Sequence, residues 1–310
     1  MSKFLVAGIT QKETIVKVNE IPIPYKPVSD TTQSIHSSIG GDAYNEAIAL
    51  KWLGNMVDFF TMIGKDDDVN IINQNQNDIK LYTDFVLRKL EATPAAVIFY
   101  DSTRKQQLFE DIKNLRDTAY DVKLFEKQLP TADMVVLANA NFCRPLLQLA
   151  RECNKKIAVN IRKFSYETEI YNKFFLENAD ILYLSDDDVT EDPYDFTKYI
   201  VDKYDPEIVI LGQGADGLII YSRNIGTYVH YKPVKTNEIV NTVGAGNALF
   251  SCFLHYYNKT GDSTLAIKNA LLFASYKIGF VGTSNGFMTE EQIETWHALI
   301  WKDEKKPLDS

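Results

Sequence analysis

Short runs of aliphatic residues alternate along this chain with longer segments of helical periodicity. The clearest aliphatic runs are residues 134–137, 156–159, 181–184 and 208–211. Segments with apolar residues near helical spacing are 144–153, 167–177 and 194–203. Short aliphatic runs are typical of buried strands, and their alternation with helices predicts βα units on a mainly parallel sheet. Ligands bind such sheets beyond the carboxyl ends of the strands, so we expect the site at that edge.

Two regions break the alternation. Residues 14–38 contain Pro22, Pro24 and Pro27, and within residues 93–107 the run 95–100 is typical of an extended strand. We predict that segments of about 14–39 and 93–107 form a small β lid, whose closure would exclude water from a reaction site. A pair of surface hairpins without a gating role is the alternative.

Composition favours one large α/β domain over residues 1–310, because a chain of this length with 45% hydrophobic residues can bury a sizeable core. The net charge of −9 argues against nucleic acid or an anionic membrane as a partner. Cys143, Cys153 and Cys252 are odd in number and lack metal-ligand spacing, so we expect reduced thiols and a cytoplasmic protein. No apolar run reaches the roughly 18 residues typical of a membrane span.

A small-residue turn formed by Gly244, Ala245 and Gly246 precedes the apolar, helix-like run 248–257. Such a turn lets a phosphate approach the backbone, where N–H groups and the dipole of the following helix favour negative charge. The pattern predicts phosphoryl transfer as the chemistry. An ordinary tight turn before a helix is the alternative.

A second glycine pair, Gly40 and Gly41, begins an amphipathic run over residues 43–53. Together the two segments resemble the ribokinase-like (pfkB) carbohydrate kinases. The family's upstream signature is matched at Gly40, Gly41, Asn45, Ala47, Leu53 and Gly54, and its downstream signature at Asn241, Thr242, Gly244, Ala245, Gly246 and Ala248. The resemblance implies a ribokinase-like three-layer αβα sandwich with a mainly parallel central sheet and a small β lid.

The resemblance also implies ATP-dependent phosphorylation of a hydroxymethyl group on a small sugar or sugar-like metabolite. Gly244, Ala245 and Gly246 would stabilise the transferring phosphoryl group, and Asn247 would orient the hydroxyl. The family has an Asp as catalytic base where this chain has Asn247. A neutral amide cannot accept the hydroxyl proton, so activity is expected to be impaired and Asn247→Asp is expected to raise it.

The same resemblance assigns substrate contacts to Gly40, Gly41 and Asn45, whose amide can pair with hydroxyls. The family places a sugar-binding Asp five residues after an N-terminal glycine, and Glu13 stands at that offset from Gly8. A longer carboxylate can still accept from two hydroxyls. A solvated charge on an exposed strand is the alternative for Glu13.

The nucleotide side of the family pattern matches this chain less closely. The resemblance assigns it to Ser185, Asp188, Gly212, Gly214, Gly217 and Ser275. Asp188 would hold Mg²⁺ through water, since that ion keeps several of its waters. A monovalent cation such as K⁺ near Asn241 and Val243 would order the phosphate turn.

Two other functions stay open. The substitution at Asn247 and the altered segment 185–188 favour a catalytically impaired protein that binds a sugar or a nucleotide as a sensor. A nucleoside or vitamin kinase is the third interpretation, because ribokinase-like folds accept several alcohols. An exposed lid strand would also allow pairing into a homodimer.

Overall fold

The computed structural model describes residues 1–74, 79–103, 105–162 and 164–302. The expected domain 1–310 and the expected lid segment 93–107 therefore include some residues that lie outside the described part. Among the described residues, none of the helices combines the length and the apolar character that a membrane crossing requires.

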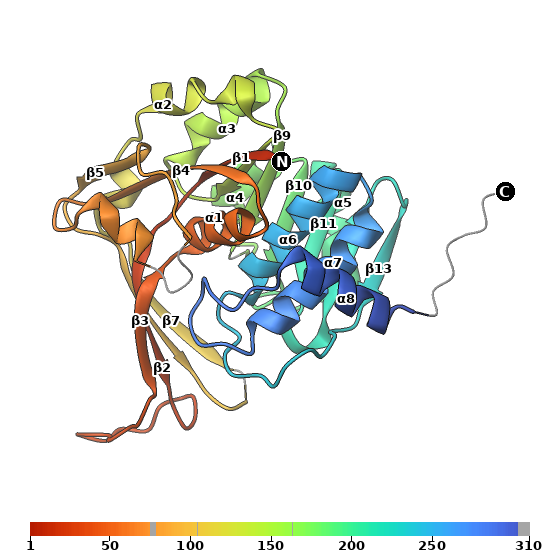
Figure 1. The fold of residues 1–310 in the computed structure, drawn as a ribbon. Helices are drawn as coiled ribbons and strands as arrows, with labels where there is room; N and C mark the ends of the chain where they lie inside the picture. Colours follow the sequence, from red (N-terminus) through yellow and green to blue (C-terminus); the bar gives the residue numbers. More distant parts are fainter. Residues whose placement is uncertain (75–78, 104, 163, 303–310) are drawn as a thin grey trace.

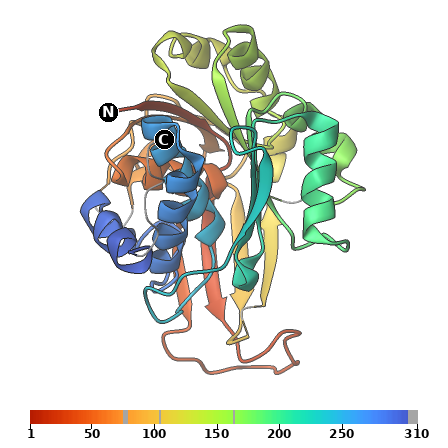
Figure 2. The same ribbon diagram turned by 90° about the vertical axis from the view of Figure 1, so that its right-hand side faces the viewer.

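The larger of two sheets has nine strands within the described residues, in the order β13-β12-β11-β10-β9-β8-β1-β4-β5. It lies between two groups of helices (Figures 1 and 2). These strands are β1 (Lys3–Ala7), β4 (Met56–Gly64), β5 (Val86–Leu90), β8 (Met134–Ala138), β9 (Lys156–Ile161), β10 (Ile181–Ser185), β11 (Ile208–Gly212), β12 (Leu218–Ser222) and β13 (Thr227–Tyr231). All neighbouring strands from β5 to β11 pair in parallel, whereas β12 and β13 add an antiparallel edge. The predicted aliphatic runs are β8 to β11, so the mainly parallel sheet is confirmed.

Helices cover both faces of this sheet. One layer contains α1 (Asp42–Trp52), α6 (Ala245–Thr260), α7 (Ser263–Lys277) and α8 (Glu290–Ile300), and the other contains α2 (Val122–Glu126), α3 (Cys143–Glu152), α4 (Glu169–Leu176) and α5 (Pro193–Tyr204). Short 3₁₀ segments are η1 (Val69–Asn73), η2 (Lys113–Asp117), η3 (Leu129–Thr131) and η4 (Gly214–Asp216). Because successive strand residues face opposite sides, Phe4 and Val6 join the first layer's core and Leu5 and Ala7 the second's. This is the expected three-layer αβα sandwich.

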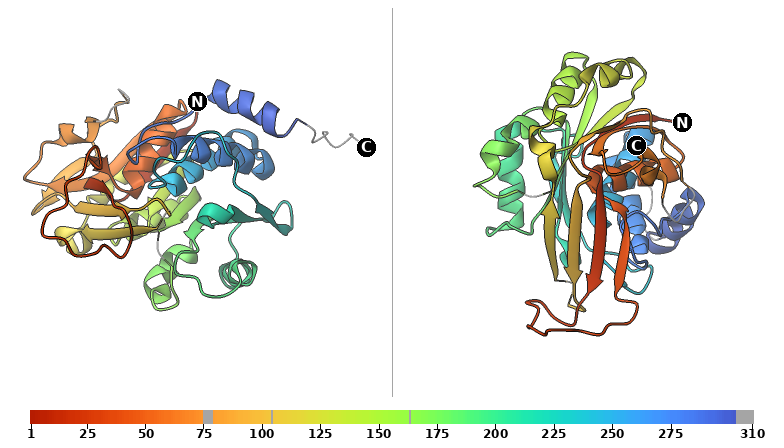
Figure 3. Two further views of the ribbon diagram at one scale, coloured as in Figure 1. Left: turned by 90° about the horizontal axis from the view of Figure 1, so that it is seen from below. Right: turned by 90° about the vertical axis from the view of Figure 1, so that its left-hand side faces the viewer.

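The smaller sheet extends away from the sandwich (Figures 1 and 3). It has the order β3-β2-β6-β7 and consists of β2 (Gln11–Lys17), β3 (Ile35–Gly40), β6 (Ala95–Tyr100) and β7 (Gln106–Asp111). The lid is confirmed as a sheet, but two of its predicted limits are wrong: β2 begins before residue 14 and β7 continues past residue 107. Residues 18–34, which contain the prolines, connect β2 to β3 without strand structure, because proline cannot donate to a ladder.

Candidate active site

The amino-terminal ends of α1 and α6 meet where the lid sheet joins the sandwich (Figure 1). Helix α1 begins directly after Gly41, and α6 begins after Gly244. At the junction the Asn247 amide Nδ2 donates to Asp42 Oδ1 at 3.2 Å. Each helix end has first-turn N–H groups that the helix itself does not bond and the positive end of its dipole, so the two ends together form a place that favours a bound anion.

Two of the predicted glycines have conformations or neighbours that other residues would not tolerate. Gly244 has φ +81° as the N-cap of α6, a left-handed conformation that a side chain disfavours. At Gly40 the reason is space, because a Cβ there would lie 2.1 Å from Glu13 Oε2. The two glycine motifs therefore position the start of α6 and the carboxylate of Glu13.

A buried polar chain lies behind Asn247. The Asn160 Nδ2 at the end of β9 donates to Asn247 Oδ1 at 3.0 Å and to Glu46 Oε1 at 2.6 Å. Glu46 is fully buried in α1, its Oε2 has no hydrogen-bond partner among the described residues, and burial raises its pKa to about 8. Glu46 is therefore largely protonated at neutral pH and adds little negative charge beside Asn247.

Glu13 of β2 is buried rather than solvated, so its alternative interpretation as an exposed charge is wrong. Its Oε1 accepts from the Gln11 side chain at 3.0 Å and from the Gly41 N–H at 2.8 Å. Its Oε2 accepts from Thr283 Oγ1 at 2.8 Å. Burial raises the pKa of Glu13, and these three hydrogen bonds oppose that shift. Glu13 thus fixes the Gly41 backbone to the loop after α7.

Asn45 has a side-chain oxygen without a hydrogen bond among the described residues, whereas both carboxylate oxygens of Glu13 already accept one. The Asn45 side chain is 3% exposed, and its Oδ1 has no hydrogen-bond partner among the described residues. A buried amide oxygen without a donor is costly, and a ligand hydroxyl would satisfy it. The position one turn into α1 therefore fits the predicted substrate contact.

Arg162, just after β9, connects the sandwich to the lid. Its guanidinium Nη1 bonds to Glu110 Oε1 of β7 at 2.6 Å, and its Nε lies 3.5 Å from Asp42 Oδ2. The Asp42 carboxylate, with help from Glu110, raises the pKa of Arg162 further above its usual range. The two ion pairs join α1 to the lid edge. The positive charge of Arg162 also neutralises part of the carboxylate charge at the site.

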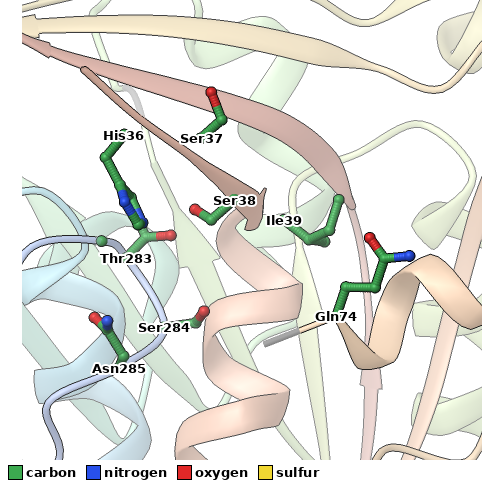
Figure 4. Close-up of a pocket in the computed structure, with 9 residues that line it drawn as sticks. His36, Ser37, Ser38, Ile39, Gln74, Thr283, Ser284 and Asn285 are labelled. Atoms are coloured by element: carbon green, nitrogen blue, oxygen red, sulfur yellow. The ribbon is translucent and has the colours of Figure 1, made fainter. Parts of the chain in front are cut away.

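A pocket of about 110 Å³ lies beside this cluster, between β3 and the loop after α7 (Figure 4). Its lining consists of His36, Ser37, Ser38, Ile39, Gln74, Gly282, Thr283, Ser284 and Asn285. Thr283 belongs to both the pocket and the Glu13 cluster. The four predicted substrate residues themselves do not appear in this lining.

Most of the predicted nucleotide residues lie at or just beyond the carboxyl ends of β10 and β11, the edge expected from the sheet topology. Ser185 ends β10 and bonds to Asp187, while the Asp186 N–H donates to the Gly212 carbonyl at 3.1 Å. Tyr183 packs behind them, since a Cβ on Gly212 or on Gly246 would lie 2.6 Å or 2.5 Å from its hydroxyl. The tyrosine thus joins the nucleotide loop to the phosphate turn.

The remaining nucleotide predictions have mixed geometry. Gly214 and Gly217 have φ +53° and +99° and form the short turn between β11 and β12. Asp188 is exposed in the turn after β10. The Ser275 hydroxyl donates to the Val234 carbonyl at 2.7 Å and accepts from the Thr236 N–H at 3.1 Å, so its hydrogen bonds serve the chain itself.

The residues predicted to bind a monovalent cation have other partners. Asn241 Oδ1 accepts from the Val243 N–H at 2.9 Å, and the Val243 carbonyl accepts from the ammonium of Lys277. A cation at this position would compete with the ammonium for the same oxygen. These residues therefore do not fit a free K⁺ ion.

A search against known families matches residues 1–290 to the model described as pfkB family carbohydrate kinase. The chain belongs to the pfkB family of carbohydrate kinases. Among curated relatives, this pfkB protein is 24% identical to a deoxyribokinase of Salmonella typhi, with 95% of this chain and 98% of the relative covered.

Solved structures similar to this pfkB protein share its fold at low sequence identity. A microbiome-derived acarbose kinase has a TM-score of 0.81 and 18% identity, with 95% of this chain and 98% of that chain covered. Arabidopsis thaliana ribokinase, solved with ribose and ATP, has a TM-score of 0.76 and 13% identity, also with 95% and 98% covered. The ribokinase-like fold is therefore shown for nearly the whole chain.

Several residues around the site of this pfkB protein were missed by the sequence analysis. Asp42, Glu46 and Lys277 lie inside segments that read as helices, where a charged residue usually indicates a solvated face. A signal was present for Glu46, because most of its neighbours in α1 are apolar. Thr283 carried no motif, and its contact with Glu13 appears only in three dimensions.

Proposed function

We propose that this protein transfers the γ-phosphoryl group of ATP to a hydroxymethyl group of a small sugar or sugar-like metabolite. The observation that carries the proposal is the convergence of the α1 and α6 amino termini, with Asp42 and Asn247 in contact at their junction. Phosphoryl transfer needs positioned donors and charge stabilisation more than covalent chemistry. The two helix amino termini, each preceded by glycine, supply both the donors and the charge stabilisation.

The phosphate turn has the main role in this proposal. Backbone N–H groups of Gly244, Ala245 and Gly246 stabilise the charge on the transferring phosphoryl group, with the Ala245 N–H shared with the Thr242 carbonyl at 3.2 Å, and Asn247 orients the acceptor hydroxyl. Gly212, Gly214 and Gly217 let the nucleotide lie against the backbone beside Ser185. Mg²⁺ is assigned to Asp188, whose exposed carboxylate would hold the ion through water. Bound Mg²⁺ would neutralise nucleotide phosphate charge.

Asp42 is the group in position to accept the proton that Asn247 cannot take. Its Oδ1 is 3.2 Å from Asn247 Nδ2 and its Oδ2 is 3.5 Å from Arg162 Nε, which leaves further lone pairs on both oxygens. A hydroxyl oriented by Asn247 would therefore lie within reach of a carboxylate. The kinase of this proposal keeps its general base but takes it from α1 instead of α6.

In this proposal the residues around the start of α1 form the wall of the site that recognises the substrate. The unpartnered Oδ1 of Asn45 accepts from a sugar hydroxyl, and Gly40 and Gly41 allow the sugar to approach the backbone. Glu13 contributes through its hold on the Gly41 N–H, with its remaining lone pairs available to a hydroxyl. A nucleoside or a vitamin alcohol would present the same hydroxymethyl group to this wall.

The sensor interpretation rests on two departures from the family pattern, the amide at position 247 and the altered segment 185–188, and predicts binding without turnover. Calorimetric titration with Mg²⁺–ATP, followed by ADP release across a panel of sugars and nucleosides, separates the two functions. Nucleotide binding with turnover supports the kinase and ranks its substrates. Nucleotide binding without turnover on any member of the panel supports the sensor, and absence of nucleotide binding refutes the nucleotide site.

A homodimer through the lid is also part of the proposal. The lid edges β3 and β7 include exposed apolar side chains, among them Ile35 at 63% and Phe109 at 57% exposure. Exposed strand edges with apolar residues favour pairing with another chain. Sedimentation at several protein concentrations would detect the dimer, and Phe109→Lys would weaken it.

A further inference from the structure

Lys277 is a lysine that the fold buries completely. It is the last residue of α7 and its exposed fraction is 0%. Its Nζ donates to two main-chain carbonyls, those of Val243 and Gly282, the second at 2.7 Å. In the part of the chain that the structure describes, no carboxylate forms an ion pair with it. A buried ammonium held by carbonyl oxygens alone is rare and costly, so its place in the fold calls for a reason.

Both carbonyls belong to segments that shape the phosphate turn. Val243 directly precedes Gly244, the N-cap of α6. Gly282 directly precedes Thr283, whose carbonyl oxygen would lie 2.7 Å from a Cβ placed on Gly244. The ammonium of Lys277 therefore joins the turn that begins α6 to the loop that contacts Glu13.

The orientation of the peptide unit links Lys277 to phosphate binding. In a trans peptide the C=O and N–H groups point in opposite directions. When the Val243 carbonyl accepts from Lys277, the N–H of Gly244 in the same unit must point away from the lysine. The positive charge on the carbonyl side also polarises this unit and strengthens its N–H as a donor to an anion.

We propose that the ammonium of Lys277 is a built-in monovalent cation, a positioning residue that orders the Gly244–Gly246 turn and makes added K⁺ unnecessary. This inference rests on the proposed kinase function. It explains why the oxygen of Val243 is unavailable to the expected free cation. A tethered cation needs no binding from solution, so the turn is ordered at any salt composition.

The charged state of Lys277 depends on its neighbours from the elements packed around it. Burial lowers the pKa of Lys277 to about 7, and the nearby Glu13 carboxylate opposes the shift. Acidic conditions therefore favour the ammonium and alkaline conditions the neutral amine. The experiments that follow are run at one pH below 7, so that the wild-type lysine is charged.

Three proteins test the inference: the wild type, Lys277→Ala, which leaves room for an ion, and Lys277→Met, which fills the space with an apolar chain. Each is assayed for phosphotransfer at equal concentrations of NaCl, KCl and NH₄Cl. We expect wild-type kcat to be the same in all three salts. We expect Lys277→Ala to lose about 10²-fold in kcat in NaCl, as for a lost oxyanion donor, and to recover at least about tenfold in KCl or NH₄Cl. Lys277→Met should stay low in every salt.

A second measurement does not need turnover. The thermal unfolding temperature of Lys277→Ala should rise when NaCl is replaced by KCl or NH₄Cl, while those of the wild type and Lys277→Met should not. If the wild type has no kinase activity, the proposed function fails, and this measurement alone decides the role of Lys277. The inference is overturned if K⁺ activates or stabilises the wild type, or if Lys277→Ala responds to no cation in unfolding.

Discussion

Exchanging the carboxylate and the amide between positions 42 and 247 tests which helix supplies the general base. The two side chains are in direct contact, with Asn247 Nδ2 at 3.2 Å from Asp42 Oδ1. Three variants cover the exchange: Asp42→Asn, Asn247→Asp, and the double variant that carries both. The double variant keeps one carboxylate and one amide but reverses their positions, so it is the matched control for charge and size.

The magnitudes follow from the chemistry of each pair. Loss of the only general base lowers a rate by about 10²–10⁴-fold, which corresponds to about 3–5 kcal/mol of transition-state stabilisation, and we expect this of Asp42→Asn. Asn247→Asp alone places two carboxylates within hydrogen-bond distance, where like charges repel each other. Its gain in rate should therefore be smaller than the sequence alone predicts. The double variant should recover most of the activity lost by Asp42→Asn.

Steady-state ADP release with a substrate found in the panel gives kcat for all four proteins, and calorimetric titration with Mg²⁺–ATP shows whether each still binds nucleotide. Retained nucleotide binding with reduced kcat in Asp42→Asn identifies a chemical defect. The reasoning is refuted if Asp42→Asn keeps kcat within about threefold of the wild type while Asn247→Asp raises it tenfold or more. That outcome would show that the α6 position alone determines proton transfer.

Other substitutions probe the walls of the site. Gly40→Ala places a Cβ 2.1 Å from Glu13 Oε2, so thermal unfolding should occur at lower temperature and the sugar KM should rise; unchanged values would contradict the close packing. Glu46 has its pKa raised from 4.5 to about 8, so between these values the folded state binds the extra proton and stability falls as pH rises. The slope is at most about 1.4 kcal/mol per pH unit, and urea titrations should show it reduced in Glu46→Gln; equal slopes would refute the assignment. Arg162→Gln removes the bridge to Asp42 and the lid, so the sugar KM should rise more than the ATP KM; the reverse order would exclude a lid role.

The parallel core was predictable because its strands are short aliphatic runs that can only be stable when buried on both faces. The limits of the lid were not, because β2 begins with Gln11, Lys12 and Glu13, which read as polar and exposed. Two of these three are buried, since the contacts that bury them come from distant segments. Local pattern therefore identifies an element more reliably than it identifies where the element ends.

The site was predictable where glycine spacing specifies backbone shape, as at Gly40, Gly41 and the turn 244–246. It was not predictable where an interaction depends on a single side chain meeting another element. A lysine at the end of a helix normally lies in solvent, and nothing near Lys277 in the sequence indicates the two carbonyls that it contacts. The sequence therefore predicted a free cation near Asn241 and Val243 without indicating the ammonium that contacts the Val243 carbonyl.

The hydrogen bond between Glu13 and Thr283 joins residues 270 positions apart. During synthesis, Glu13 leaves the ribosome long before its partner exists. The lid strand β2 therefore cannot complete the hydrogen bonds of Glu13 until the loop after α7 has emerged. A nascent chain that stalls before this loop would have most of its sheet but an unfinished substrate wall, and would be a natural target for chaperones and proteases.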